Sequence, residues 1–300
     1  MLGQSSRRKY IFLSITGIAL SAYFGICTFL YIFQRILIYK PNSEIINLPS
    51  DPNYRLAYKD IWIPIVDSSE KIHSWWFPAP IGKYSPTLPQ EQAQVLKSSP
   101  KTVLYLHGTG GNISHNLPRI EGLHQLGFSV LAIDYRGYGK SQGDFPSELQ
   151  LYQDSQAAWN YLTKVRNISP QQIIIYGESL GGAIALDLAI KNPNAGGLIL
   201  QSTFTSMSEV ANQSPWMKAI PVSLLINQKF DSAEKIKSLQ VPVLLIHGLN
   251  DSGIPSSMSQ RLYELAPNQK QLFLVPDAEH ARIYNPKYSY LQAMQSFVSN

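Results

Sequence analysis

The feature that most constrains the fold of this chain is a serine flanked by glycines, in the pentapeptide GESLG at residues 177–181. It follows an apolar β-branched run at 173–176, which predicts a strand, and it opens an apolar stretch at 180–190, which predicts a helix. Small residues on both sides leave room for a tight strand-to-helix turn, from which the hydroxyl of Ser179 projects clear of a sheet. The pentapeptide therefore predicts an α/β fold and a candidate nucleophile.

The same alternation of strands and helices continues along the chain. Several of the runs are continuously β-branched, as is typical of strands buried on both faces of a parallel sheet. The predicted strands are Ile61–Val66, Ile72–Phe77, Val103–Leu106, Val130–Ile133, Ile173–Tyr176, Leu198–Leu200, Val243–Ile246 and Leu272–Val275. The predicted helices are Asn116–Leu126, Ser147–Val165, Leu180–Ile190, Ser257–Ala266 and Pro286–Val298. Such alternation indicates a mostly parallel α/β sheet.

Two segments depart from this alternation. Residues 82–100 are rich in Pro, Ser and Gln and are expected to form a surface loop. Residues 203–235 are too long for an ordinary connection and are rich in apolar side chains. They are expected to form either a short cap over a site or two short helices packed on the edge of the sheet.

The N-terminus contains 24 residues without a charge, Tyr10–Phe33. As a helix they would be about 36 Å long, enough to cross a hydrocarbon core of about 30 Å. The alternative is a cleavable signal peptide with a cleavage site at Ala19-Leu20-Ser21. The apolar cores of signal peptides span only about 7–15 residues, and this run continues well beyond that site. The sequence favours an uncleaved anchor.

Basic residues flank the apolar run, with Arg7, Arg8 and Lys9 before it and Arg35 and Lys40 after it. The excess on the N-terminal side predicts a cytoplasmic N-terminus and a catalytic domain outside the cytoplasm. The chain is thus divided into a basic segment (1–9), a transmembrane anchor (10–33), a stalk (34–59) and a catalytic domain (60–300).

A serine nucleophile needs a base, and the base needs an orienting acid. Asp251 follows the predicted strand Val243–Ile246, and His280 follows the predicted strand Leu272–Val275. The order Ser179, Asp251, His280 is the order expected for this type of turn. Asp277 and Glu279 compete for the role of the acid, but they lie within three residues of His280, too close to come from a separate loop.

The remaining histidines receive other roles. His107 and His247 each end a predicted strand and precede a glycine, so we expect them to brace loops. His73 lies in an alternating strand and is expected at the surface. His115 and His124 lie on or near a helix without a motif.

The oxyanion of an acyl-transfer intermediate needs two N–H donors. The backbone N–H of Leu180, directly after the nucleophile, is the first candidate. The second should come from the glycine-rich loop HGTGGN at 107–112, where the N–H of Thr109 is the preferred donor and that of Gly110 the alternative.

Other classes of function are excluded or disfavoured. With 25 Lys plus Arg against 20 Asp plus Glu, the net charge of +5 is too small to indicate a nucleic-acid partner unless the basic residues cluster. The lone cysteine, Cys27, excludes a disulfide framework and a cysteine-based metal centre. The tripeptide GKS at 139–141 resembles the end of a phosphate-binding loop, but Asp134 stands where that motif has its first glycine. The glycines at 108 and 110 begin a dinucleotide-binding motif, G-x-G-x-x-G, but Ile113 stands at its last position. We expect no cofactor and no metal, and interpret 134–141 as a structural turn.

Five motifs together resemble the α/β-hydrolase superfamily: HGTGGN (107–112), DYRGYGKS (134–141), GESLGG (177–182), HGLND (247–251) and AEH (278–280). The chain resembles in particular a membrane-anchored branch with a short cap that is related to protein depalmitoylases, and FDSAEKIKSL at 230–239 fits that branch. The resemblance implies an eight-stranded, mostly parallel sheet whose second strand is antiparallel, a Ser-Asp-His triad and no cofactor. Where the family has HGNAGN, this chain has Thr109 in place of Asn.

These observations predict a serine hydrolase acting on carboxylic esters or thioesters. The apolar residues of 203–226 and the adjacent membrane favour an acylated or lipid-like substrate. A serine peptidase with the same triad and a non-catalytic, membrane-anchored binding module remain alternatives. The oligomeric state is not predicted.

Overall fold

The computed structural model describes residues 2–80, 101–267, 269–280, 283 and 290–299, and it contains an eight-stranded sheet with the strand order β10-β9-β8-β7-β4-β6-β3-β2. All adjacent strands are parallel except at β3, which is antiparallel to both neighbours. The predicted mostly parallel sheet with an antiparallel second strand is confirmed. The strands are β2 (Lys59–Pro64), β3 (Lys71–Phe77), β4 (Thr102–Leu106), β6 (Ser129–Ile133), β7 (Ile173–Glu178), β8 (Gly197–Gln201), β9 (Val243–Gly248) and β10 (Lys270–Val275).

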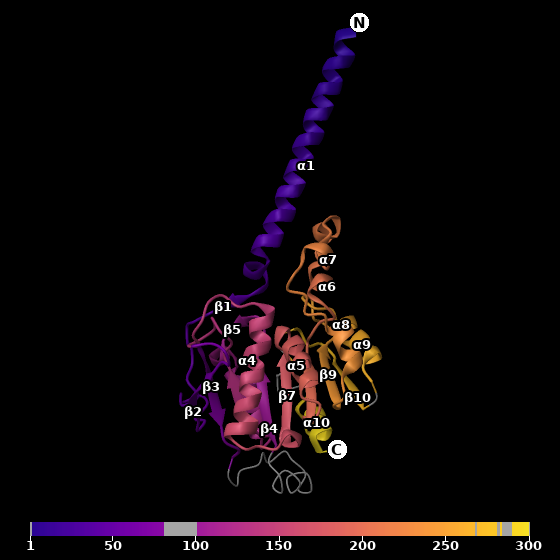
Figure 1. The fold of residues 1–300 in the computed structure, drawn as a ribbon. Helices are drawn as coiled ribbons and strands as arrows, with labels where there is room; N and C mark the ends of the chain where they lie inside the picture. Colours follow the sequence, from indigo (N-terminus) through magenta and orange to yellow (C-terminus); the bar gives the residue numbers. More distant parts are fainter. Residues whose placement is uncertain (1, 81–100, 268, 281–282, 284–289, 300) are drawn as a thin grey trace.

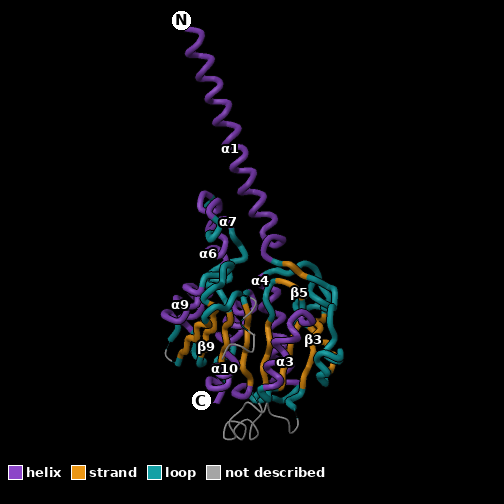
Figure 2. The backbone as a smooth tube through the Cα atoms, turned by 180° about the vertical axis from the view of Figure 1, so that it is seen from behind, coloured by secondary structure: helices purple, strands orange, loops and turns teal. Residues whose placement is uncertain are grey.

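Helices cover both faces of the sheet (Figures 1 and 2). Side chains of α4 (Glu148–Asn160), α5 (Leu180–Lys191) and α9 (Ser256–Leu265) belong to one buried apolar cluster. Side chains of α3 (Leu117–Gln125) and α10 (Tyr290–Ser299) belong to a second cluster on the opposite face. A π-helical turn, Tyr161–Val165, continues α4 to the predicted end of that helix. The predicted start of the last helix, at Pro286, and the predicted surface loop at 82–100 lie outside the described residues.

The N-terminal helix α1 (Leu2–Ile38) projects away from the domain (Figure 1). Its residues Lys9–Ile38 are long and apolar enough to cross a membrane by length and composition, and most of their side chains are exposed. The helix continues five residues beyond Phe33, where the sequence placed its end. Among these additional residues, Gln34, Leu37 and Ile38 contact the domain, as described below.

The segment predicted as a stalk, residues 34–59, is not a free spacer but lies along the domain. Tyr39 is only 1% exposed within the core. The adjoining strand β1 (Lys40–Pro41) pairs with β5 (Gly110–Gly111). The side-chain amide of Asn112 donates to the carbonyls of Asn42 and Glu44, at 2.9 and 2.7 Å. The polar composition of the segment concealed its few apolar residues, which pack against the core (Ile45, Tyr54, Leu56 and Tyr58).

Residues 203–235 form a set of short helices that rise beside α1 (Figures 1 and 2). Apolar side chains of this segment, which is called the cap below, line a cavity at the sheet's carboxyl edge. The cap contains α6 (Met207–Ala211), a 3-10 turn (Pro215–Ala219), α7 (Val222–Leu225) and α8 (Ser232–Lys235). Further 3-10 turns in the chain are Ile113–Asn116, Pro170–Gln172 and Ile236–Ser238.

The prediction that His73 lies at the surface is wrong. Its strand, β3, is an interior strand of the sheet, with β2 and β6 on its two sides. The imidazole is fully buried, and its Nε2 lies 2.6 Å from Oδ1 of Asp60 on β2. Every residue of β3 after Lys71 is buried, so both faces of the strand are covered and its alternating pattern did not reflect an exposed face.

Candidate active site

Ser179 occupies a sharp turn between β7 and α5. Its backbone angles, φ 53° and ψ −119°, lie in a region that residues with a Cβ rarely adopt. A Cβ at Gly177 would lie 2.1 Å from the carbonyl oxygen of Gly181, and a Cβ at Gly181 would lie 2.1 Å from the carbonyl oxygen of Leu106. Both glycines are therefore required sterically. The turn is held by the Ser179 N–H, which donates to Gln201 O at 2.8 Å.

The structure brings the three predicted catalytic residues together from three loops at the carboxyl edge of the sheet. Oγ of Ser179 lies 3.1 Å from Nε2 of His280. Nδ1 of the same imidazole lies 2.5 Å from Oδ2 of Asp251. With its proton on Nδ1, the imidazole donates to the carboxylate and accepts from the serine hydroxyl. This geometry allows His280 to remove the proton from Ser179.

The Asp251 carboxylate is buried and held by several donors. Oδ1 accepts from the backbone N–H groups of Gly253 and Ile254, at 3.0 and 2.8 Å. Nε2 of His247 lies 3.1 Å from Oδ2, and Nδ1 of His247 lies 2.6 Å from Ser259 Oγ. Burial alone would raise the pKa of Asp251, but hydrogen bonds from the two histidines and Ile254 outweigh it and hold that pKa well below its ordinary value. His247 thus braces the loop as predicted, through the acid itself.

The pKa of His280 is shifted upward from its ordinary value of 6.5. Burial opposes protonation of the ring, but the hydrogen bond and charge of the Asp251 carboxylate outweigh it. The same carboxylate therefore orients the imidazole and stabilises the imidazolium that forms when the ring accepts a proton. A raised pKa also means that the ring is neutral, and able to act as a base, only toward higher pH.

Both predicted oxyanion donors lie beside the serine. Leu180 is the first residue of α5, a position whose N–H has no acceptor within the helix. Thr109 lines the same cavity as Ser179 and Leu180. The neighbouring Gly108 approaches so closely that a Cβ there would lie 3.3 Å from the Cβ of Ser179. The hydroxyl of Thr109 points elsewhere and donates to Ile38 O at 2.5 Å. This hydroxyl is therefore engaged with α1, which leaves the backbone N–H as the donor that Thr109 could offer to the site.

A buried ion pair that the sequence did not identify lies directly behind the turn. Glu178, the residue before the nucleophile, forms a salt bridge with Arg119 of α3. The hydroxyl of Tyr105 donates to Glu178 at 3.0 Å, and Arg119 also donates to Asn116 at 2.7 Å. The signal in the sequence was the single acidic residue at the end of an otherwise apolar strand, which requires a buried partner.

The turn at 134–141 supports the glycine-rich loop from below. Oδ1 of Asp134 accepts from the N–H of Ile113 at 2.8 Å. The hydroxyl of Tyr135 donates to His107 O at 3.0 Å, and that of Tyr138 donates to Thr109 O at 2.9 Å. These bonds agree with the structural role expected for this turn.

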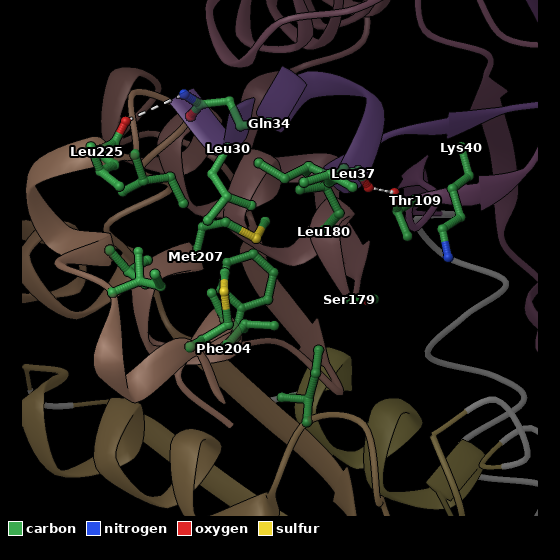
Figure 3. Close-up of a pocket in the computed structure, with 18 residues that line it drawn as sticks. Leu30, Gln34, Leu37, Lys40, Thr109, Ser179, Leu180, Phe204, Met207 and Leu225 are labelled. Atoms are coloured by element: carbon green, nitrogen blue, oxygen red, sulfur yellow. Dashed lines mark hydrogen bonds between the residues drawn. The ribbon is translucent and has the colours of Figure 1, made fainter. Parts of the chain in front are cut away.

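A cavity of about 320 Å³ opens above Ser179 (Figure 3). Its walls come from α1 and from the cap, and nearly all of its described lining is apolar. Lys40 is the one charged residue among those lining residues. The lining residues are Leu30, Gln34, Leu37, Ile38, Lys40, Thr109, Ser179, Leu180, Phe204, Met207, Val210, Ala211, Met217, Ile220, Val222, Leu225, Ile226 and Ile254. The sequence predicted the contribution of the cap but not that of α1.

Comparisons with known proteins identify relatives of this chain. Residues 97–233 match the family described as serine aminopeptidase, S33. An uncharacterized protein of Mycobacterium tuberculosis is 35% identical over 85% of this chain and 83% of its own length. Protein bem46 of Schizosaccharomyces pombe is 32% identical over 87% of this chain and 82% of its own length.

Solved structures share the fold. An esterase of Pyrococcus furiosus superposes with a TM-score of 0.65 at 22% identity, over 87% of this chain and 97% of the esterase. A puromycin-hydrolyzing peptidase of Mycobacterium tuberculosis superposes with a TM-score of 0.62 at 18% identity, over 83% of this chain and 40% of the peptidase. At these identities the likeness extends to the fold and not to the substrate.

Proposed function

The chain belongs to the α/β-hydrolase superfamily, and on that basis we propose that it is a serine hydrolase that cleaves carboxylic ester or thioester bonds of acylated substrates. The observation that carries the proposal is the continuous contact from Ser179 through His280 to Asp251 at the base of an apolar cavity. A nucleophile, a base and an orienting acid in this order are the requirements of acyl transfer through a serine.

The proposed reaction has two halves. Oγ of Ser179 attacks the substrate carbonyl carbon while Nε2 of His280 takes the hydroxyl proton. The bond from that carbon to the leaving oxygen or sulfur then breaks, and the imidazolium returns its proton to the leaving group. Water attacks the resulting acyl-serine ester, His280 takes a proton from the water, and that proton returns to Oγ as the carboxylic acid departs.

Charge that develops on the carbonyl oxygen needs donors that are already in place. Leu180 and Thr109 line the same cavity as Ser179, and we assign the donor role to their backbone N–H groups. Leu180 also lies at the N-terminus of α5, where the helix dipole favours negative charge. Removing one such donor typically costs about 100–1,000-fold in turnover.

The lining of the cavity supports an acyl group over a peptide with a free amino terminus. An aminopeptidase needs an acidic side chain to pair with the substrate ammonium group, and the cavity's described lining contains no carboxylate. Its apolar wall residues instead match a hydrocarbon chain. Residues 97–233 match a family described as serine aminopeptidase, S33, so the experiment below compares esters with aminoacyl amides.

The proposal includes α1 as a membrane anchor, with the catalytic domain outside the cytoplasm. Support comes from the 24 uncharged residues Tyr10–Phe33, from the basic residues before them and from the exposure of the helix outside the domain.

The Ser179→Ala variant tests the function directly. We expect it to lose labelling by a fluorophosphonate probe and hydrolysis of p-nitrophenyl esters, while Ser208→Ala in the cap retains both. Labelling of Ser179→Ala at the wild-type level would refute the assignment of the nucleophile. Cleavage of aminoacyl amides but not of esters by the wild type would favour the peptidase. No labelling and no turnover of any ester would favour a binding module.

A further inference from the structure

The end of α1 forms one wall of the cavity that contains Ser179. Leu30, Leu37 and Ile38 line the cavity, and Figure 3 shows Leu30 pointing toward Met207 of the cap. Leu30 also lies inside the uncharged run Tyr10–Phe33. A helix of the length and composition needed to span a membrane therefore supplies part of the lining of the candidate substrate site.

The contact between α1 and the cap is specific rather than incidental. Gln34, the amide near the end of this apolar helix, is only 6% exposed. Its Oε1 accepts from the N–H groups of Asn227 and Gln228 at 2.7 and 3.2 Å, and its Nε2 donates to Leu225 O at 3.3 Å. One side chain thus satisfies three backbone groups of the cap, which fixes the cap against the helix.

The cap extends along α1 toward the middle of the apolar run. The hydroxyl of Tyr23 donates to Ala219 O of the cap at 3.1 Å. Tyr23 lies 15 residues before the end of α1 at Ile38, which corresponds to about 22 Å at 1.5 Å per residue. The tip of the cap is therefore placed beside the segment that would lie within the bilayer.

The outer surface of the cap tip suits such a position. Trp216 is 59% exposed and Leu224 is 83% exposed. Between Glu209 and Lys229 the sequence contains one charged residue, Lys218. Exposed Trp and Leu side chains are typical of the apolar face of segments that lie at the boundary between headgroups and acyl chains, where a lysine can keep its charge in water.

We propose that the cavity binds the acyl chain of a membrane-resident ester or thioester, that this chain enters from the bilayer between α1 and the cap, and that Leu30 and Leu37 help to set the chain length that is accepted. The proposal rests on the proposed hydrolase function and adds the origin of the substrate and the part of the protein that selects it. The cavity volume of about 320 Å³ lies at the lower end of the range of ligand pockets, about 300–1,000 Å³. It suits one chain, and access from the bilayer spares that chain any exposure to water.

The experiment uses the full-length protein in phosphatidylcholine vesicles with p-nitrophenyl acetate and p-nitrophenyl palmitate. Leu30→Trp narrows the cavity from α1, and Ile32→Trp is the matched control because Ile32 is an exposed residue of the same helix outside the lining. Rates are divided by the concentration of active sites, titrated with a short-chain fluorophosphonate, so that misfolded protein does not enter the comparison.

We expect Leu30→Trp to lower the ratio of palmitate to acetate hydrolysis by about tenfold or more, the effect of a misfit of one methylene or more in an apolar pocket. Ile32→Trp should leave the ratio unchanged. An unchanged ratio in titratable Leu30→Trp protein would refute the proposal while leaving the hydrolase function intact. If that variant cannot be titrated, Leu37→Trp against Ile36→Trp makes the same comparison, with the same outcomes.

The origin of the substrate is tested with the wild-type protein by surface dilution. Adding phosphatidylcholine at a constant total amount of palmitate ester should lower the rate in proportion to the ester's fraction in the bilayer. The rate with the water-soluble acetate should not change. A palmitate rate that depends only on the bulk concentration would overturn access from the bilayer. Loss of hydrolysis of both esters in the Ser179→Ala variant separately checks the underlying function.

Discussion

Replacing Asp251 with asparagine tests the catalytic assignment most sharply, because it preserves shape and removes only the charge and one acceptor. In the structure Oδ1 accepts from Gly253 and Ile254, and Oδ2 faces Nδ1 of His280. The asparagine oxygen will keep the two backbone bonds, which places the amide NH₂ against the imidazole. Nδ1 must then lose its proton to accept, and Nε2 becomes protonated. The ring presents an N–H to Ser179 and cannot act as its base.

The size of the effect follows from this change of tautomer. Amide substitution of the carboxylate in a serine triad lowers turnover by about 10⁴-fold, which is about 5.4 kcal/mol at 1.36 kcal/mol per factor of ten. The assay is kcat/KM for p-nitrophenyl acetate as a function of pH. In the wild type, activity should rise with pH through an apparent pKa above 6.5, because His280 must be neutral and its pKa is raised. Without the carboxylate, the two largest contributions that raise the pKa of His280 are lost, and burial, which lowers that pKa, should move the acid limb of the residual activity to lower pH.

The competing acids provide matched controls. Asp277→Asn and Glu279→Gln remove the other two carboxylates near His280 in the sequence and should leave kcat/KM close to the wild-type value, because the proposed reaction gives neither carboxylate a role. Thermal unfolding of each variant separates loss of activity from loss of fold. The reasoning is refuted if folded Asp251→Asn keeps more than a tenth of wild-type activity, or if either control loses activity to the extent expected for Asp251→Asn.

Two further variants test the architecture around the serine. Gly181→Ala places a methyl group 2.1 Å from Leu106 O and 2.5 Å from His107 O. We expect the free energy of unfolding, measured with denaturant, to fall by about 1–3 kcal/mol. An unchanged free energy of unfolding would contradict the close approach. Thr109→Val removes the hydrogen bond from the hydroxyl to Ile38 O but keeps the backbone N–H. Hydrolysis of the acetate ester should therefore fall by much less than the roughly 100-fold loss expected when an oxyanion donor is removed. A larger loss would assign the donor role to the side chain.

Much of the fold could be predicted because interior strands of a parallel sheet are apolar on both faces. β7 illustrates this, since its continuous run of isoleucines admits few other structures. The predicted catalytic residues follow from the same regularity. The carboxyl ends of parallel strands meet at one edge, so residues in the loops after β7, β9 and β10 are brought together although they are up to 101 positions apart.

The features that the sequence did not predict depend on contacts between distant residues, and nothing in the neighbouring sequence identifies the partner. The length of the apolar run indicates a spanning helix, but not that Gln34 would meet the cap 193 residues later. The burial of Tyr39 and the bonds of Asn42 depend on β1 pairing with β5, two strands of only two residues each. His73 was misplaced because the alternation of its strand resembles that of a sheet with one exposed face. In each case tertiary packing, rather than local pattern, determined the outcome.

The end of α1 and the adjoining residue Lys40 are joined to two separate parts of the site, and this bears on how the protein can be studied. Gln34 holds the cap, Ile38 O accepts the hydroxyl of Thr109 in the glycine-rich loop, and the N–H of Lys40 donates to Thr109 O at 3.3 Å. A helix that only tethered the domain would need none of these bonds. Because they link the helix to both the cap and the loop beside Ser179, removing α1 would remove a wall of the cavity and a support of that loop together. Activity measured on a fragment without α1 would then describe a different site, with its selectivity for long chains altered first.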